Sequence, residues 1–311
     1  MKKCLIVDKM HESIISLLRD IGYEADYRPQ IKREEVLDII GQYDGIIVRS
    51  KLQIDQEFID KAHQLKFVGR AGAGLDQLDE EALKANSIHF LNAPEGNRDA
   101  VGEHAVGMLL NLFNRINQAD QEVRQGTWNR EGNRGVELMG KTVGIIGYGN
   151  MGQAFARRLV GFGVTVLAYD KYRSNYGDAF ARQETMDEIF QHADILSLHV
   201  PLTEETHFLV DEAFLNQFSK DIFIINTARG KVMKLTSLSA ALGAGKVKGA
   251  ALDVLENEKL GQLSAEQKHT LAQLQQSNRV LFTPHVAGWT FESYKKINQT
   301  LVRKITAFDL A

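Results

Sequence analysis

The stretch that decides the fold is Val143-Gly144-Ile145-Ile146-Gly147-Tyr148-Gly149-Asn150-Met151-Gly152. Its first four residues form an apolar run typical of a buried strand, and the rest match the spacing G-x-G-x-x-G. Phe155 and Leu159 share one face of the helical stretch 153–160 that follows. In such a unit the first glycine permits a tight turn, the second lets backbone approach a pyrophosphate, and the third lets helix pack on strand. An ordinary turn can also hold three glycines, but the strand before and the helix after predict a dinucleotide-binding turn.

A carboxylate follows at the end of the next predicted strand, where Asp170 lies eighteen residues after Gly152. It can accept hydrogen bonds from the ribose hydroxyls and would repel a 2′-phosphate, which favours NAD over NADP. Lys171 and Arg173 weaken this preference, because a nearby cation can accommodate that phosphate. Further contacts are expected beyond the carboxyl ends of the strands. Asp253 needs a partner there, which the nicotinamide amide or ribose would supply, whereas His199 could equally be a strand-end histidine bonded to backbone. The predicted cofactor-binding residues are Gly147, Gly149, Asn150, Met151, Gly152, Asp170, His199, Val200, Pro201, Thr227, Ala228, Asp253 and Gly288.

Strands alternate with helical segments along the whole chain, which predicts an α/β protein with two doubly wound parallel sheets. One series of apolar runs covers residues 3–8, 45–49, 67–71 and 88–91. The other covers residues 142–146, 164–169, 195–199, 222–226, 249–254 and 280–283. We expect a flavodoxin-like substrate domain of residues 1–97 plus 288–311 and a Rossmann NAD-binding domain of residues 98–287, with the chemistry in the cleft between them.

Two helical patterns mark the crossings between these domains. Val101, Ala105, Met108, Leu112 and Ile116 recur at helical spacing and predict one long helix with a single apolar stripe, capped by Asn97. Residues 292–308 are also helical in pattern, and we expect them to return to the first domain.

The composition is that of a globular chain of 311 residues with 44% hydrophobic residues and a formal net charge of −3. This charge gives no basic field for nucleic acid. Cys4 is the only cysteine, so no intrachain disulfide forms and a reducing compartment fits. The apolar run after Met1 is too short for a secretory signal, and no stretch approaches a membrane span. We therefore expect a cytoplasmic protein that binds no membrane and no metal.

Three groups downstream of the glycine motif suffice for an oxidation at a hydroxyl carbon. Arg229 can clamp a carboxylate with two parallel hydrogen bonds. His285 can exchange a proton with a substrate hydroxyl, and Glu258 can hold that imidazole in its charged form. Beside a hydride carrier, these groups predict interconversion of a 2-hydroxy acid and a 2-oxo acid. Each also has a structural reading, as a strand-end cap, a loop carboxylate or a packed histidine. His104 and His207 lack an equivalent setting and are taken as a packing or interface residue and a loop residue.

These motifs resemble the D-isomer-specific 2-hydroxyacid dehydrogenase family over essentially the whole chain. The matching segments are residues 69–76, 92–97, 140–152, 199–201, 226–230, 249–254 and 283–285. The resemblance implies Arg229, Glu258 and His285 as the catalytic set, an N-terminal substrate domain closed by the last helix, and a homodimer formed through the cofactor domain.

Within the family the chain most resembles the phosphoglycerate dehydrogenases, which oxidise 3-phosphoglycerate to 3-phosphohydroxypyruvate in serine biosynthesis. Residues 126–130 match a dimer arm that lends Arg130 to the neighbouring subunit, and because the sequence stops at Ala311 no serine feedback through an added domain is expected. For Arg49 and Arg70, which would bind the substrate phosphate, surface solvation or a structural ion pair is an equal alternative. The predicted substrate-binding residues are Arg49, Ser50, Arg70, Ala73, Gly74 and Asn97.

Some positions depart from the family pattern. Lys259 stands where proline is common, which puts the placement of the Glu258 loop in doubt. Lys231 and Lys234 stand where apolar or acidic residues are more frequent, and they either add positive potential or belong to a solvated loop.

Two other functions remain open. One is a reductase for glyoxylate, hydroxypyruvate or another 2-oxo acid, in which Trp289 either lines the pocket or packs under the last helix. The other is a non-catalytic NAD-sensing protein like the corepressors that resemble this family.

Overall fold

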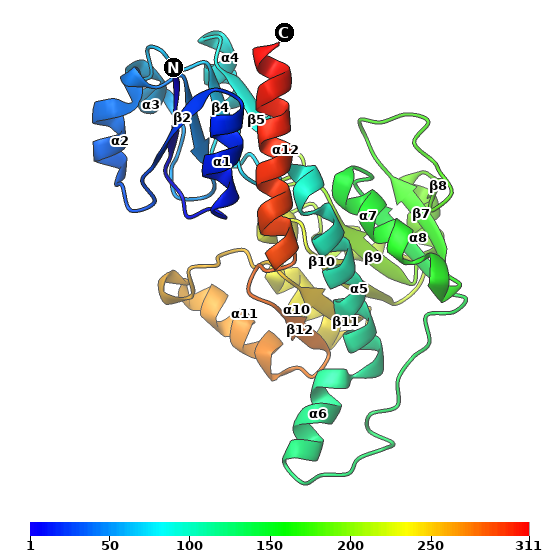
Figure 1. Ribbon diagram of the computed structural model, residues 1–311. Coiled ribbons are helices and arrows are strands. Elements are labelled where there is room, and N and C mark those ends of the chain that lie inside the picture. The colour runs from blue at the N-terminus through cyan, green and yellow to red at the C-terminus, as the bar shows by residue number, and fades with distance from the viewer. Residues whose placement is uncertain (311) are drawn as a thin grey trace. The chain divides into compact units, whose positions relative to one another are not determined.

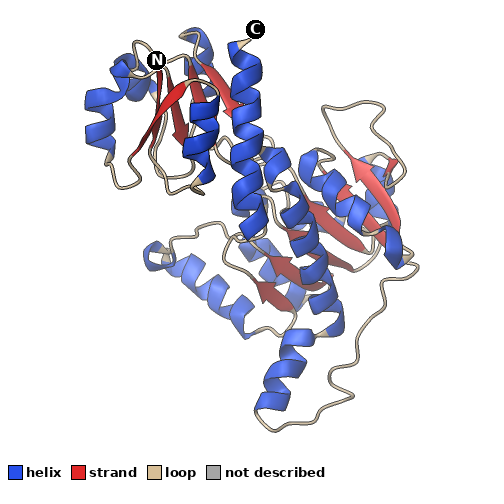
Figure 2. Cartoon of the chain, viewed as in Figure 1, coloured by secondary structure: helices blue, strands red, loops and turns tan. Residues whose placement is uncertain are grey.

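The computed structural model describes residues 1–310, which fall into two units (Figure 1). Unit 1 is Met1–Arg98 together with the described residues from Trp289 onward, and unit 2 is Asp99–Gly288. Each unit is an α/β sandwich with a fully parallel sheet, and helices flank both sheets (Figure 2). Sequence patterns thus predicted the fold class correctly.

Unit 1 contains five strands in the order β2-β1-β3-β4-β5, which is the flavodoxin-like order. β1 and β3 lie inside the sheet. All of β3 and the last three residues of β1 are buried, as parallel strands covered on both faces must be. β2 was missed in the sequence because its side chains are mostly half-exposed at the sheet edge. The strands are β1 (Lys2–Ile6), β2 (Tyr23–Tyr27), β3 (Gly45–Val48), β4 (Phe67–Arg70) and β5 (His89–Asn92).

Helices cover both faces of this sheet. On one face α1 (Ser13–Asp20) and α12 (Phe291–Asp309) pack over β1 and β4 through Ile14, Ile297 and Leu301. Gly96 lies so close to α12 that an added Cβ would be 2.6 Å from the Cα of Ile297. Unit 1 therefore depends on a helix that is remote in sequence. The remaining helical segments of unit 1 are α2 (Arg33–Ile39), η1 (Ile40–Gln42), α3 (Gln56–Lys61), α4 (Glu80–Ala85) and η2 (Pro94–Gly96).

Unit 2 contains seven strands in the order β12-β11-β10-β9-β6-β7-β8. This is the Rossmann order with one further strand, and its order reverses between β6 and β9. Dinucleotides bind at such a reversal, outside the carboxyl ends of the strands. The strands are β6 (Thr142–Ile146), β7 (Thr165–Tyr169), β8 (Arg182–Gln183), β9 (Ile195–Leu198), β10 (Ile222–Asn226), β11 (Val247–Leu252) and β12 (Val280–Phe282).

Two apolar clusters enclose the sheet of unit 2. One joins the sheet to α5 and α7 through Met108 and Phe155, and the other joins it to α8–α11 through Ile189 and Leu238. The helical segments are α5 (Arg98–Asn114), α6 (Ile116–Arg124), α7 (Asn150–Arg158), η3 (Val160–Phe162), α8 (Met186–His192), α9 (Glu212–Asn216), η4 (Gly230–Val232), α10 (Leu235–Gly243), η5 (Leu260–Gln262) and α11 (Ala265–Gln276).

The prediction of one long helix through Ile116 is wrong. Arg115 adopts a left-handed backbone with φ 51° and separates α5 from α6. The side chain of Asn111 accepts from the N–H of Asn117 at 3.0 Å, and Arg115 donates to the carbonyl of Gly132 at 2.7 Å, so local polar contacts outweigh the apolar period. Asn97 is not the predicted helix cap, because its Oδ1 is buried without a hydrogen bond among residues 1–310.

Over residues 1–310, no helix combines the length and the apolar composition needed to cross a bilayer.

Candidate active and cofactor site

The glycine motif forms the turn between β6 and α7. Gly147 has φ +90°, and an added Cβ would lie 2.6 Å from the carbonyl oxygen of His199 at the end of β9. A Cβ on Gly152 would lie 2.2 Å from the carbonyl oxygen of Gly147, so α7 rests directly on the turn. Beside Gly149 no atom lies within 4 Å of the same position, and Asn150 and Met151 then open the helix. The two outer glycines are therefore required by packing, while the middle one leaves the room that a pyrophosphate needs.

Asp170 is fixed at the carboxyl end of β7. Its Oδ2 accepts from the backbone N–H of Tyr148 in the glycine turn at 2.9 Å, and its Oδ1 accepts from the N–H of Tyr172 at 3.1 Å. The hydroxyl of Tyr176 accepts from the Asp170 N–H at 2.8 Å. Each carboxylate oxygen can still accept from a ribose hydroxyl, so this geometry fits an adenosine ribose.

Polar atoms without partners lie at the ends of β9 and β10. His199 packs on Phe155, its Nε2 lies 2.8 Å from Ser197 Oγ, and burial lowers its pKa to about 4. His199 Nδ1 and Thr227 Oγ1 are buried without hydrogen bonds among residues 1–310. Buried polar atoms are normally paired, and these two lie where a bound dinucleotide would supply partners. Val200 and Pro201 continue from β9, and Ala228 follows Thr227, its N–H donating to Asn226 Oδ1 at 3.0 Å.

His285 and Glu258 meet as predicted. The imidazole Nδ1 lies 3.0 Å from Glu258 Oε2, and the two side chains are 48% and 47% exposed. The hydrogen bond that His285 donates to Glu258 raises the pKa of His285 above its ordinary value, against an opposing effect of desolvation and of the Arg229 charge. His285 has φ 54°, which a residue other than glycine adopts rarely and mostly where its surroundings enforce it. At the next position the N–H of Lys259 donates to Asn257 Oδ1 at 3.0 Å, a bond that proline could not make.

Asp253 holds the backbone around His285. It is 1% exposed, and its two carboxylate oxygens accept from the N–H groups of Val286 and Ala287, both at 2.9 Å. The Thr283 hydroxyl donates to Oδ1 at 2.6 Å, and the Asp253 carbonyl accepts from the His285 N–H at 2.7 Å. We expected the nicotinamide amide or ribose to satisfy this carboxylate. The structure corrects this expectation, because the hydroxyl of Thr283 and the N–H groups of Val286 and Ala287 already donate to the carboxylate.

His104 on α5 completes this arrangement and was missed by sequence reasoning. Its Nε2 lies 3.1 Å from Thr283 Oγ1 and 3.7 Å from Asp253 Oδ1. Its position in the sequence, among the buried residues of α5, indicated only packing. Thr283 offered a weak signal, since it ends a strand two residues before His285.

Arg229 follows β10 and belongs to the same region of unit 2. Its charge acts on His285, and its Nη1 donates to the Ala228 carbonyl at 2.7 Å. An added Cβ on Gly230 would lie 1.9 Å from the carbonyl oxygen of Leu255, so glycine allows the Glu258 segment to lie against this turn. Lys231 and Lys234 are exposed. Gly288, a predicted cofactor residue, is the last residue of unit 2.

The predicted substrate residues all lie on unit 1, at or after the carboxyl ends of its strands. Arg49 donates its backbone N–H to Asp8 at 2.7 Å, and its guanidinium lies 4.3 Å from the Trp289 ring and 4.8 Å from the Tyr294 ring. Ser50 beside it is exposed. Trp289 thus stacks on Arg49.

Arg70 and its neighbours form a second polar turn after β4. An added Cβ on Gly72 would lie 1.6 Å from Arg70 Nη1, so the guanidinium covers this glycine. The Ala73 carbonyl accepts from the side chain of Asn92 at 2.8 Å, and Gly74 is half-buried. The orphaned Oδ1 of Asn97 makes it a candidate for a ligand contact.

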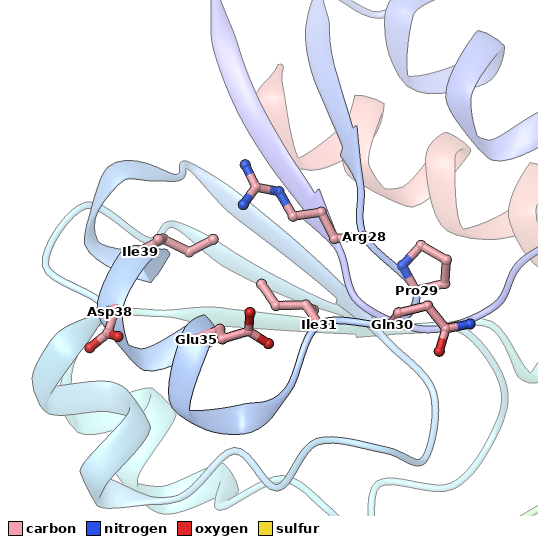
Figure 3. Close-up of a pocket in the computed structure, with 7 residues that line it drawn as sticks. All are labelled: Arg28, Pro29, Gln30, Ile31, Glu35, Asp38 and Ile39. Carbon is pink, nitrogen blue, oxygen red and sulfur yellow. The ribbon is translucent and has the colours of Figure 1, made fainter.

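A separate hollow on unit 1 has no predicted site residue in its wall (Figure 3). It lies beside β2 and α2, and its charged lining groups are Arg28, Glu35 and Asp38. Arg28 pairs with Asp26 at 2.8 Å. Among residues 1–310, no three His, Cys, Asp or Glu side chains form a group that could hold a metal ion.

The model of the family described as D-isomer specific 2-hydroxyacid dehydrogenase, NAD binding domain, matches residues 106–287. The chain belongs to this family. The matched NAD-binding domain lies within unit 2, and NAD is the cofactor of this chain, as the glycine motif predicted.

Relatives cover nearly all of this dehydrogenase chain. A D-3-phosphoglycerate dehydrogenase of Archaeoglobus fulgidus is 33% identical over 97% of this chain and 56% of its own length, and a hydroxypyruvate reductase of Thermotoga maritima is 34% identical over 88% of each. The chain therefore spans about half the length of the phosphoglycerate dehydrogenases that it matches. A crystal structure of D-lactate dehydrogenase from Aquifex aeolicus, complexed with NAD and lactic acid, has a TM-score of 0.84 at 26% identity and covers 99% of this chain and 96% of its own.

Proposed function

We propose that this chain interconverts a D-2-hydroxy acid and the corresponding 2-oxo acid with NAD. The observation that carries the proposal is the His285–Glu258 pair, held on a strained loop by Asp253 in the NAD-binding unit. Because Glu258 engages Nδ1, the other ring nitrogen remains for a substrate. Within residues 1–310, Nε2 makes no hydrogen bond.

In the oxidative direction, Nε2 of His285 takes the hydroxyl proton, and the electron pair of the O–H bond forms the C=O bond while hydrogen leaves C2 with the C–H pair as hydride. NAD, when bound, accepts the hydride from C2. Glu258 stabilises the imidazolium that forms. In reverse, the imidazolium donates its proton to the ketone oxygen.

Arg229 is the proposed carboxylate clamp. Its fork can hold a carboxylate with two parallel hydrogen bonds, and its position in the region of His285 would fix which face of C2 reacts. The opposing effect of its charge on the pKa of His285 supports this proximity.

We propose a phosphorylated hydroxy acid, 3-phosphoglycerate, as the substrate, which would place the enzyme in serine biosynthesis. Support comes from Arg49, whose guanidinium faces are held by Trp289 and Tyr294. Among the described residues the guanidinium N–H groups of Arg49 make no hydrogen bond, so the edge of the guanidinium can bind an anion. Arg70, Ser50, Ala73, Gly74 and Asn97 are the further proposed contacts.

Reduction of hydroxypyruvate is the second candidate. It is supported by the hydroxypyruvate reductase of Thermotoga maritima, which is 34% identical over 88% of this chain, a similarity equal to that of the phosphoglycerate dehydrogenases. A non-catalytic NAD sensor is less well supported, since the proton-transfer pair is assembled.

The segment from α6 to β6 is the proposed homodimer surface. It exposes large apolar side chains, which ordinarily mark an interface. These residues are Ile116, Val123, Trp128, Val136 and Met139.

A panel of D-2-hydroxy acids, followed by the NADH absorbance, tests the reaction. We expect turnover of 3-phosphoglycerate to exceed that of D-glycerate, and Arg49→Gln to reduce this preference. A higher kcat/KM for D-glycerate would favour the hydroxypyruvate reductase. Tight NAD binding without NADH formation from any hydroxy acid would overturn the proposed activity.

A further inference from the structure

The charged groups that surround Asp170 are held in a fixed arrangement. Lys171 Nζ lies 2.6 Å from Oε1 of Glu205, and the hydroxyl of Tyr172 donates to Oε2 of the same carboxylate. Glu205 belongs to the loop after β9, more than thirty residues along the chain. One carboxylate from a remote loop therefore engages both residues that follow Asp170.

The second cation near Asp170 is engaged by backbone. Arg173 donates from Nη1 to the carbonyl of Tyr148 in the glycine turn. The backbone N–H of Tyr148 in turn donates to Asp170 Oδ2 at 2.9 Å. Arg173 thus binds the protein's own turn, on the side where Asp170 is anchored.

These contacts affect which charges would face the adenosine ribose of a bound dinucleotide. A carboxylate at this strand end accepts from the 2′-hydroxyl of NAD, whereas NADP needs a cation there for its 2′-phosphate. Lys171 is the nearest such cation in sequence. Glu205 forms an ion pair with it at 2.6 Å and offsets its charge.

We propose that Glu205 is a specificity-determining residue, which excludes NADP by neutralising Lys171. In this proposal two residues distinguish NAD from NADP. Asp170 repels the 2′-phosphate, and Glu205 pairs with the cation that would otherwise attract that phosphate. This inference concerns nucleotide binding alone and does not depend on the proposed hydroxy-acid reaction.

Binding of NADH and NADPH, followed by nucleotide fluorescence at low ionic strength, tests the proposal. Glu205→Gln should tighten NADPH binding by about three- to fivefold, the scale of an exposed ion pair, and should change NADH binding less than twofold. Lys171→Met in the same chain as Glu205→Gln should abolish the gain. In 0.5 M salt the gain should shrink, because exposed charges are screened over a few ångströms.

Glu204→Gln is the matched control. Glu204 is exposed, precedes Glu205 and makes no ion pair among residues 1–310, so its loss changes the net charge equally. An equal gain in NADPH affinity for Glu204→Gln would overturn the proposal in favour of a general charge effect. Equal changes in NADH and NADPH affinity in Glu205→Gln would also overturn it, because they would show that Glu205 only holds the two loops together. An unchanged NADPH affinity in a variant that melts like the wild type would also overturn it.

Discussion

At His285, two carboxylates control different parts of one residue. Asp253 fixes the backbone through the neighbouring N–H groups, and Glu258 fixes the ring through Nδ1. The left-handed φ of 54° shows that the surrounding loop enforces this geometry. The ring is thus oriented before any substrate arrives.

Replacement of the imidazole should stop proton transfer without affecting the nucleotide. We expect His285→Asn to lower kcat by about 10²–10⁴-fold, the usual contribution of a positioned acid–base group. Asparagine tolerates the left-handed backbone, so the loop should persist. Stopped-flow turnover with a parallel NADH titration checks this, and a variant with wild-type kcat would remove His285 from the mechanism.

Loss of the Glu258 charge should move the pH dependence of both directions. The hydrogen bond that His285 donates to the Glu258 carboxylate raises the pKa of His285. Reduction needs the imidazolium, so its rate is full below that pKa and falls as pH rises through it. Oxidation needs the neutral ring, so its rate falls as pH drops through the same pKa.

In Glu258→Gln the pKa of His285 should decrease, and both midpoints should shift to lower pH. Profiles of kcat/KM against pH in each direction measure this shift. Glu266→Gln, an exposed position at the start of α11, is the control. Midpoints that stay at the wild-type pH would contradict the pairing seen here.

At the scale of elements, the loop after β12 depends on one buried side chain. Asp253→Ala leaves the N–H groups of Val286 and Ala287 without their acceptor. We expect a loss of about 2–4 kcal/mol in the free energy of unfolding, as for other buried polar groups left unpaired, together with reduced turnover. Urea unfolding measures the first effect, with the exposed Asp221→Ala as control. A loss no larger than the control's would show that the loop is held otherwise.

A substitution at the start of α7 should weaken nucleotide binding without lowering the stability of the fold. An alanine Cβ at Gly149 meets no protein atom, so Gly149→Ala should melt like the wild type. It would enter the space where a pyrophosphate approaches the backbone, and we expect the NADH dissociation constant to rise about tenfold or more. Gly161→Ala, which also meets no atom, should change neither quantity. Wild-type NADH affinity in Gly149→Ala would place the phosphates elsewhere.

The sequence patterns predicted most central elements because their residues are apolar and periodic. β2 was missed because only Tyr23 of its five residues is buried. The break at Arg115 was missed because it arises from hydrogen bonds of Asn111 and Gly132 that the apolar period does not register. Motif spacing predicted the His285–Glu258 pair, but the contact of His104 with Thr283 joins residues 179 positions apart and follows only from the fold.

At the scale of the whole molecule, the net charge of −3 opposes an anionic substrate. Under the proposed function, local cations such as Arg49 would attract the substrate. We expect kcat/KM for 3-phosphoglycerate to fall several-fold between 0.05 and 0.5 M salt, and to fall less for D-glycerate, which carries fewer charges. Equal salt dependence of the two acids would argue against a phosphate-binding arginine.

The placement of α12 in unit 1 has a consequence for synthesis on the ribosome. β1, β3 and β4 emerge early, yet the helix that covers Cys4, Ile6 and Phe67 begins roughly 220 residues after β4. At about 5–20 residues per second, this apolar face waits about ten to forty seconds for its cover. Unit 2, which is continuous, can complete its core first. We therefore expect chaperones to bind the exposed apolar face of the nascent N-terminal sheet.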